Sequence, residues 1–145
     1  MQGQNVTEIV KVKTGAKLEK LSSYSRLVMV DKWIHVSNTA GRNPATQQIP
    51  EGLEAQTHQV FDNIETALKA VGSSLADVIA TRVYIQTPGD THAVMTIFGE
   101  RFRGVDPTTT VTSPPLASDT YKVEIEVTAY LGAGSADVTL IDTST

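Results

Sequence analysis

Hydrophobic positions alternate with polar ones in several short segments of the chain and recur at helical spacing in two longer segments. The clearest alternation runs from Tyr121 to Leu131, where Val123, Ile125, Val127 and Ala129 alternate with Lys122, Glu124, Glu126, Thr128 and Tyr130. Because successive side chains of a strand point to opposite faces, this segment predicts a strand with one apolar and one polar face. The polar face is either solvated, as in an ordinary half-buried strand, or lines a cleft in which a carboxylate handles protons.

The same two periodicities predict the remaining elements. Strands are expected over residues 6–13, 27–30, 33–36, 78–86 and 108–112. Helical spacing predicts a helix over residues 53–71 that stops before Gly72, and Asp90 can cap a second helix that runs to Phe102. The apolar stripe of the first helix comprises Leu53, Val60, Ile64, Ala67, Leu68 and Val71, and the inward positions of the second are Val94, Ile97, Phe98 and Phe102. Loops are expected over residues 22–26 and 37–52, and Asp31-Lys32 is expected to form a two-residue hairpin turn.

The order of these elements is β-β-β-α-β-α-β-β, which indicates an α+β fold with both helices on one face of a mixed sheet. The length of 145 residues suits a single domain with its own core, and we assign that domain to residues 1–131. Residues 132–145 are mostly small and polar, apart from Val138, Leu140 and Ile141. They are expected to form a tail, which could end in a short extra strand.

Composition argues against several classes of protein. The net charge is −4 and the 12 Lys and Arg residues are scattered, whereas nucleic-acid-binding proteins present a basic stripe. No apolar run is long enough to span a membrane and no secretory signal is visible, so we expect a cytoplasmic protein that binds neither nucleic acid nor membrane. The chain contains no cysteine, which excludes disulfides, thiolate nucleophiles and cysteine-bound metals.

Candidate chemistry is limited to acid–base groups. The three histidines, His35, His58 and His92, lack the spacing of a metal site, and no motif for binding a nucleotide or activating a serine is present. We therefore expect no metal and no organic cofactor. What remains is a strand carboxylate, Glu124 or Glu126, that could move a proton to or from water. From the residues alone, a purely structural protein remains an alternative.

Several segments together resemble the Rid/YjgF family of reactive-intermediate deaminases, which act on imines and enamines. In chain order these segments are Tyr24-Ser25, Val36-Ser37, Glu54-Ala55-Gln56-Thr57, the stretch from Ala70 to Val78, and Val123-Glu124-Ile125-Glu126. The junction around Gly72-Ser73-Ser74-Leu75 and the Glu-Ile-Glu strand are the most specific of them.

This resemblance implies a chorismate-mutase-like fold of the bacillus type, assembled as a homotrimer in which the sheets form a central barrel. Clefts between the subunits would bind a small-molecule substrate, and an imine or enamine would be hydrolysed there to a carbonyl compound and ammonia without a cofactor. Glu124 matches the family glutamate that positions the water and passes a proton, and Glu126 matches a second, structural glutamate. Tyr24 and Ser37 match residues that line the same cleft and help to hold the substrate, although Tyr24 could instead only pack at the interface. Asn38 occupies the position after the cleft serine, where the family usually has glycine, and it is a further candidate for substrate binding.

One departure from the family pattern concerns the carboxylate of the substrate. Deaminating members carry an arginine that grips this group in a bidentate fork, and Thr109 occupies that position here. Losing a buried charged contact of this kind typically costs about 2–5 kcal/mol. Arg42, in the loop after Ser37, is the nearest candidate in the sequence for a substitute cation.

The resemblance leaves two functions open. The first is a hydrolytic imine or enamine deaminase, which could act on a 2-aminomuconate-type substrate whose larger dicarboxylate skeleton suits a remodelled cleft. The second is a non-catalytic trimer that binds a small molecule or a protein partner, and the loss of charge at Thr109 favours it. The ribonuclease activity attached to some family members conflicts with the acidic charge of the chain.

Overall fold

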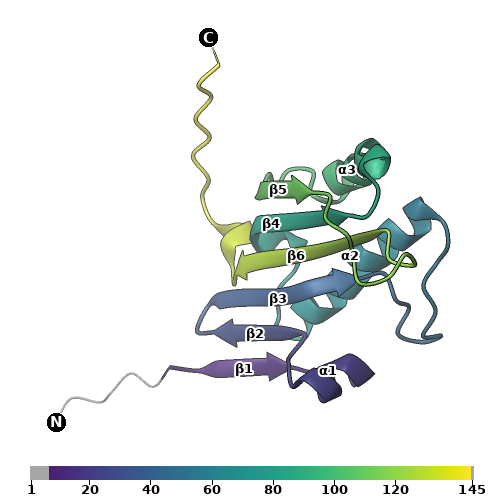
Figure 1. The fold of residues 1–145 in the computed structure, drawn as a ribbon. Coiled ribbons are helices and arrows are strands. Elements are labelled where there is room, and N and C mark those ends of the chain that lie inside the picture. Colours follow the sequence, from purple (N-terminus) through teal and green to yellow (C-terminus); the bar gives the residue numbers. More distant parts are fainter. Residues whose placement is uncertain (1–6, 145) are drawn as a thin grey trace.

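Residues 7–144 are described in the computed structural model, and their strands form one mixed sheet (Figure 1). The strands are β1 (Ile9–Val12), β2 (Leu27–Val30), β3 (Trp33–Ala40), β4 (Val78–Ile85), β5 (Thr108–Thr112) and β6 (Val123–Tyr130). The helices are α1 (Lys17–Ser22), α2 (Leu53–Lys69) and α3 (Thr91–Arg101). Three 3₁₀ turns are also present: η1 (Leu75–Asp77) before β4, η2 (Pro88–Asp90) before α3 and η3 (Ala133–Ser135) after β6. The strand order is β1-β2-β3-β6-β4-β5, and neighbouring strands are antiparallel except β4 and β5.

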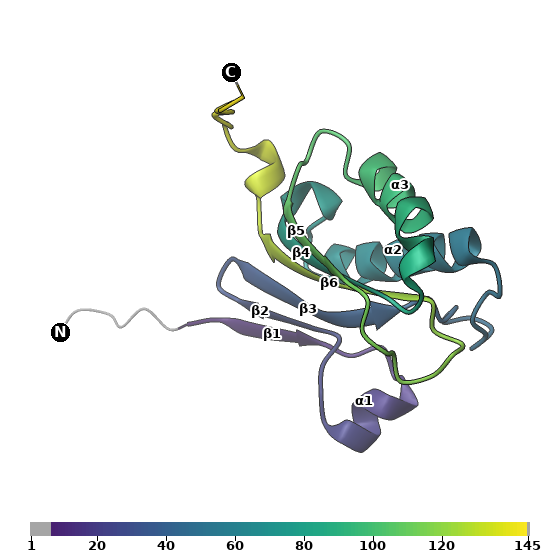
Figure 2. The same cartoon turned by 45° about the horizontal axis from the view of Figure 1, so that its top comes forward.

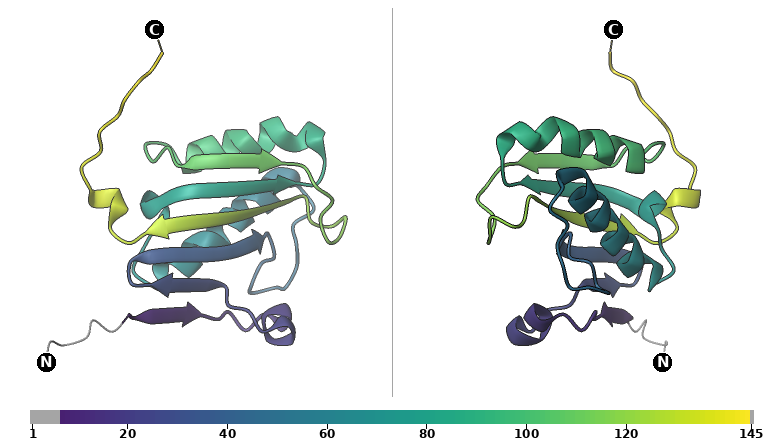
Figure 3. Two further views of the ribbon diagram at one scale, coloured as in Figure 1. Left: turned by 60° about the vertical axis from the view of Figure 1, so that its left-hand side comes forward. Right: turned by 90° about the vertical axis from the view of Figure 1, so that its right-hand side faces the viewer.

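Helices α2 and α3 both pack on one face of the sheet (Figures 2 and 3). This arrangement follows from the alternation in β6, because Val123, Ile125 and Ala129 face the helices and are fully buried. Glu124 and Glu126 occupy the opposite face and are half-buried. The α+β architecture with a mixed sheet, expected from the order of the elements, is confirmed.

Aromatic side chains from both long helices fill the centre of the core. Phe61 of α2 is fully buried and packs edge-on against Phe98 and Phe102, with ring centroids 6.2 and 5.6 Å apart. The inward positions expected for the second helix, Val94, Ile97, Phe98 and Phe102, are all buried. The expected inward face of α3 is therefore confirmed. In α2, Val60, Ile64, Ala67 and Leu68 are buried as expected, whereas Phe61 lies outside the predicted stripe.

Two elements differ from those expected. The loop predicted from Ser37 begins only after Ala40, because β3 continues through polar residues to pair with β6. The short helix α1 was not predicted, because Leu18 and Leu21 are 58% and 82% exposed and form no apolar stripe. The extended β3 and α1 both border the candidate site.

The ends of three other elements also depart from expectation. Asp90 precedes α3 as expected, but its side chain makes no capping hydrogen bond. Part of the first predicted strand, including Val6, lies outside the described residues. Residues 132–144 contain the turn η3 and no strand, so the extra strand considered for the tail is absent from the part that is described.

Within residues 7–144, no helix has the length and apolarity that a membrane crossing requires.

A buried glutamine ties together two segments that border the sheet. Gln56 of α2 is fully buried, and its amide donates hydrogen bonds to the carbonyl oxygens of Pro50 and Thr120 at 3.0 and 3.1 Å. Its own oxygen accepts a hydrogen bond from the backbone N–H of Lys122 at 2.6 Å. The connection before α2 is thereby held against the connection that leads into β6.

We expect Gly41→Ala to destabilise the fold. A Cβ atom at this position would lie 2.6 Å from the backbone oxygen of Gln56 and 2.8 Å from its Cγ, and the oxygen cannot move without shifting α2. Overpacking of this kind typically costs about 1–3 kcal/mol. Chemical denaturation measures the change in the free energy of unfolding.

Gly99→Ala is the matched control for this substitution. Gly99 lies inside α3, and nothing lies within 4 Å of the added Cβ atom. Removing a glycine from a helix interior should stabilise the fold by about 0.5–1 kcal/mol. Equal effects of the two substitutions would contradict the close approach of Gly41 to α2.

The start of the tail, at η3, is held by the carboxylate of Asp77 at the end of η1. Asp77 accepts hydrogen bonds from the backbone N–H of Gly134 at 2.8 Å and from the hydroxyl of Ser73 at 2.7 Å. Burial alone would raise the pKa of Asp77, but these and neighbouring backbone hydrogen bonds lower it below the ordinary value. Beyond η3 the chain leads away from the sheet (Figure 1).

Candidate functional site

Glu124 lies near the start of β6, on the sheet face opposite to α2 and α3. It pairs with Ala40 on β3 and with Tyr84 on β4, and its neighbours Val123 and Ile125 are fully buried. Partial burial raises the pKa of Glu124 above its ordinary value, and the positive charge of Arg26 opposes part of this rise. The raised pKa suits a group that accepts and returns a proton.

A bulge in β3 lies directly beside Glu124. Between Val36 and Thr39 the register with β6 shifts, so β3 contains one more residue than the segment opposite. The side-chain amide of Asn38 donates a hydrogen bond to Glu124 Oε2 at 3.4 Å. The hydroxyl of Ser37 donates to the carbonyl oxygen of Ser25 at 2.7 Å, which fixes the bulge to the segment before β2.

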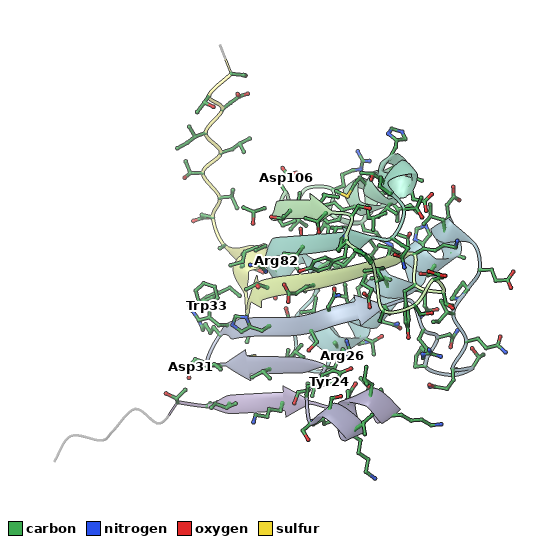
Figure 4. All side chains as sticks on the ribbon, viewed as in Figure 1. Tyr24, Arg26, Asp31, Trp33, Arg82 and Asp106 are labelled. Atoms are coloured by element: carbon green, nitrogen blue, oxygen red, sulfur yellow. The ribbon has the colours of Figure 1, made fainter. Side chains whose placement is uncertain are left out.

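Arg26 lies opposite Ser37, directly before β2, and its carbonyl oxygen accepts a hydrogen bond from the Ser37 N–H at 2.9 Å. Its side chain is only 15% exposed. Nη1 donates to the carbonyl oxygen of Asn38 at 3.0 Å and to Thr39 Oγ1 at 3.3 Å, and Nη2 donates to the Tyr24 hydroxyl at 3.4 Å. Figure 4 shows Tyr24 and Arg26 together, at the end of the sheet opposite to Trp33.

The short helix α1 supplies a buried anion behind this arginine. Glu19 is 2% exposed, and its Oε2 lies 3.6 Å from Arg26 Nε. The same carboxylate accepts hydrogen bonds from the backbone N–H of Thr14 at 3.0 Å and from the Thr14 hydroxyl. A buried carboxylate with these partners holds the guanidinium in place.

The structure thus brings four of the predicted site residues together in one chain. Tyr24, Ser37, Asn38 and Glu124 are connected through Arg26 and the β3 bulge. We call Tyr24, Arg26, Ser37, Asn38 and Glu124 the Glu124 cluster. Its arrangement can orient a polar ligand against a carboxylate that exchanges protons.

Two other predicted site residues lie outside this cluster. Thr109 is exposed on β5, two strands away from β6, and it aligns with Thr81 rather than with Tyr84, the β4 partner of Glu124. Arg42 follows β3, and its guanidinium donates hydrogen bonds to the carbonyl oxygen of Gln47 and to the hydroxyl of Tyr121. Arg42 therefore already has partners in its own loop.

The second strand glutamate has a different environment from the first. Glu126 forms an ion pair with Arg82 of β4 at 3.0 Å, and both side chains are substantially exposed. Exposed ion pairs of this kind contribute at most about 1 kcal/mol to stability. Glu124 is joined to Asn38 instead, which separates the two carboxylates by their surroundings.

Sequence reasoning missed Arg26 and Glu19. Arg26 was placed at the end of a loop, and its only signal was a cation directly after Tyr24-Ser25. Glu19 gave no signal, because its burial depends on a helix that the hydrophobic pattern does not reveal. In the part of the chain that is described, no three histidine or carboxylate side chains gather as a metal site would require.

The amino-acid sequence of the chain is similar to those of several known proteins. The chain is 29% identical over 113 residues to the 2-iminobutanoate/2-iminopropanoate deaminase of Rattus norvegicus, covering 77% of this chain and 82% of that protein. It is 32% identical over 85 residues to a RutC family protein of Sulfurisphaera tokodaii, covering 58% of this chain and 68% of that protein.

Comparison of the fold with solved structures identifies the same group of proteins. The crystal structure of Rv2704 from Mycobacterium tuberculosis, a member of the YjgF/YER057c/UK114 family, superposes with a TM-score of 0.78 at 29% identity, covering 86% of this chain and all of that one. Residues 14–131 match the family model described as endoribonuclease L-PSP. The chain therefore belongs to the endoribonuclease L-PSP family, which includes the YjgF and Rid proteins.

Proposed function

We propose that this protein is a hydrolytic deaminase that converts an imine or enamine to a carbonyl compound and ammonia. Water adds to the imine carbon while Glu124 accepts one of its protons. Glu124 then returns this proton to the nitrogen, which gives a carbinolamine. Glu124 next takes the hydroxyl proton of the carbinolamine and passes it to the nitrogen while the C–N bond breaks, so that ammonia leaves and the carbonyl forms. The step needs no oxidant or reductant, because only water is consumed.

The observation that carries this proposal is the environment of Glu124. A half-buried carboxylate with a raised pKa lies beside the polar bulge of β3, and the Asn38 amide holds one of its oxygens. Similarity to the deaminase of Rattus norvegicus supports imine hydrolysis as the reaction. A 2-aminomuconate-type compound remains a candidate substrate, because it also carries a carboxylate on the carbon that bears nitrogen.

Imines generated in the assay by an amino-acid oxidase provide the test. The protein should accelerate the appearance of ammonia and of the 2-oxo acid above the rate of spontaneous hydrolysis. The same assay should include aminomuconate-type substrates. Rates equal to the spontaneous rate for both classes would refute the deaminase proposal.

We further propose that the chain assembles as a homotrimer and that clefts between subunits complete the site. Support comes from the face of the sheet opposite to α2 and α3. There Ile9, Val30, Trp33 and Tyr130 follow one another across four strands in register. Trp33 is 48% exposed, and it packs edge-on against Tyr130 at 5.1 Å. Apolar rows of this kind commonly mark surfaces that bind another chain.

Trp33→Lys is expected to shift the assembly toward the monomer. A charge in an apolar contact between subunits loses its hydration, and the row of neighbouring apolar side chains cannot pair with it. Light scattering of the wild type should give the mass of three 15.6 kDa chains, and the variant should give a lower mass. Lys69→Glu, at the exposed end of α2, is the control and should leave the mass unchanged.

A non-catalytic binding protein is the second candidate, and Thr109 favours it. A hydroxyl cannot replace the charge and fork of the family arginine. A small acid that raises the melting temperature without being turned over, and loses this effect in Ser37→Ala and Thr109→Ala, would support binding alone.

A further inference from the structure

We propose that Arg26 binds the carboxylate of the substrate beside Glu124 and is the specificity-determining cation of the site. This inference rests on the proposed deaminase function. The proposal assigns to the residue directly before β2 a role that Thr109 cannot fill, since Thr109 has no charge. It also assigns the role to Arg26 rather than to Arg42.

The guanidinium of Arg26 is held so that one edge remains available. Nε faces Glu19 at 3.6 Å, and Nη1 is occupied by the Asn38 carbonyl oxygen and Thr39 Oγ1. Nη2 donates one long hydrogen bond, 3.4 Å, to the Tyr24 hydroxyl. Since Nη2 carries two protons, its second N–H can bind an incoming anion.

Tyr24 provides a second donor at the same edge. Its oxygen accepts the hydrogen bond from Arg26 Nη2, so its own hydroxyl proton is free for another acceptor. A carboxylate has two oxygens, and one can accept from Arg26 Nη2 while the other accepts from the Tyr24 hydroxyl. The pair therefore presents two donors to one carboxylate, as a bidentate arginine does alone.

Two carboxylates act on Arg26, and neither is hydrogen-bonded to its Nη2 edge. Glu19 lies on the far side of the guanidinium, and its oxygens are already shared with Thr14. Glu124 is the other carboxylate whose charge acts on Arg26, and its raised pKa means that it carries a proton more readily. A substrate carboxylate can therefore bind at Nη2 without displacing Glu19 from Nε or Glu124 from Asn38.

Asn38 sets the spacing between the two functional groups. Its side-chain amide donates to Glu124, and its backbone oxygen accepts from Arg26. Asn38 therefore lies between the carboxylate of Glu124, which transfers the proton, and the guanidinium of Arg26. In a 2-imino acid the carboxylate is attached directly to the imine carbon, so a short separation of this kind brings the reacting carbon to Glu124. Imines without an adjacent carboxylate gain nothing from Arg26.

Steady-state kinetics with two matched imines test the proposal. For a 2-imino acid, Arg26→Gln should raise KM by at least about 30-fold, as expected for loss of a buried charged contact. For a carboxylate-free imine of similar size, the loss in kcat/KM should be at least about 10-fold smaller than for the 2-imino acid, since this imine makes no contact with Arg26 and responds only to the lost charge beside Glu124. Arg26→Lys should recover part of the loss, and Arg42→Gln should behave as wild type.

Equal losses on both imines would overturn the proposal, because they would show that Arg26 only shapes the bulge. A rise in KM caused by Arg42→Gln instead would overturn it as well. Should Arg26→Gln fail to fold, Tyr24→Phe removes the second donor and retains the ring. It should raise KM for the 2-imino acid alone.

Binding of 2-oxobutanoate separates this proposal from the proposed function. Titration followed by NMR should show binding to the wild type and its loss in Arg26→Gln. If the wild type binds this acid and hydrolyses no imine, the deaminase proposal fails while the assignment of Arg26 stands. If the wild type neither binds the acid nor hydrolyses an imine, the assignment fails too.

Discussion

Glu124→Gln is expected to lower kcat/KM for imine hydrolysis by about 10²–10⁴, the range typical of a lost general acid–base group. Glutamine has the shape of glutamate and can still accept a hydrogen bond from Asn38, but it cannot accept a proton from water. Ammonia release from an imine generated in the assay measures the change. Glu126→Gln is the matched control, since Glu126 lies on the same strand face and pairs with Arg82. Its activity should remain close to that of the wild type.

The stability of Glu124→Gln should separate a catalytic from a structural role. Burial raises the pKa of Glu124, so the folded state binds protons more tightly than the unfolded state. Stability contributed by this group therefore increases as the pH falls through the raised pKa, and the charged form opposes folding at neutral pH. The variant should melt at the same temperature as the wild type or higher. A large loss of stability would mean that the carboxylate supports the fold.

The pH dependence of kcat/KM follows from the same shift. If Glu124 must be charged to accept a proton from water, activity falls as the pH drops through its pKa. Because that pKa is raised, the fall should begin at a higher pH than an ordinary glutamate would give. Glu124→Gln should lose this acidic limb.

Phe61→Ala is expected to produce the largest loss of stability. Its ring is fully buried, packs against Phe98 and Phe102, and lies 5.4 Å from the Arg101 guanidinium, so its removal leaves a cavity between α2 and α3. Replacing a buried phenylalanine by alanine typically costs about 3–5 kcal/mol. Urea denaturation should show a lower midpoint with a similar slope.

Two further variants provide controls for the loss of stability in Phe61→Ala. Phe61→Leu keeps most of the buried volume and should cost less than Phe61→Ala. Val138→Ala, at a position that is 82% exposed, should change the free energy of unfolding by less than about 0.5 kcal/mol. If Phe61→Ala were as mild as Val138→Ala, the aromatic core would not contribute as described.

Much of the fold could be predicted because its core faces follow simple periodicities. The alternation in β6 and the helical spacing in α2 each bury one face, so local sequence and tertiary structure agree. The bulge in β3 could not be predicted in this way. Ser37 and Asn38 are polar and resemble a loop, and they remain in a strand because β6 pairs beyond them.

The candidate site was only partly visible in the sequence. Glu124 stood out through its strand and through the family resemblance, which also pointed to Tyr24 and Ser37. Arg26 was not predicted, because its contacts with Glu19 and Asn38 exist only in the tertiary structure. An isolated arginine at the end of a predicted loop carries no such information.

The spatial order of the strands affects how the chain can fold during synthesis. β6 is the last strand in the sequence, but it lies between β3 and β4 in the sheet. Until β6 leaves the ribosome, β3 and β4 each present an unpaired edge, and such edges promote association with other chains. A chain that ends before Val123 would therefore form two separate strand groups, β1–β3 and β4–β5, instead of a smaller version of the same domain.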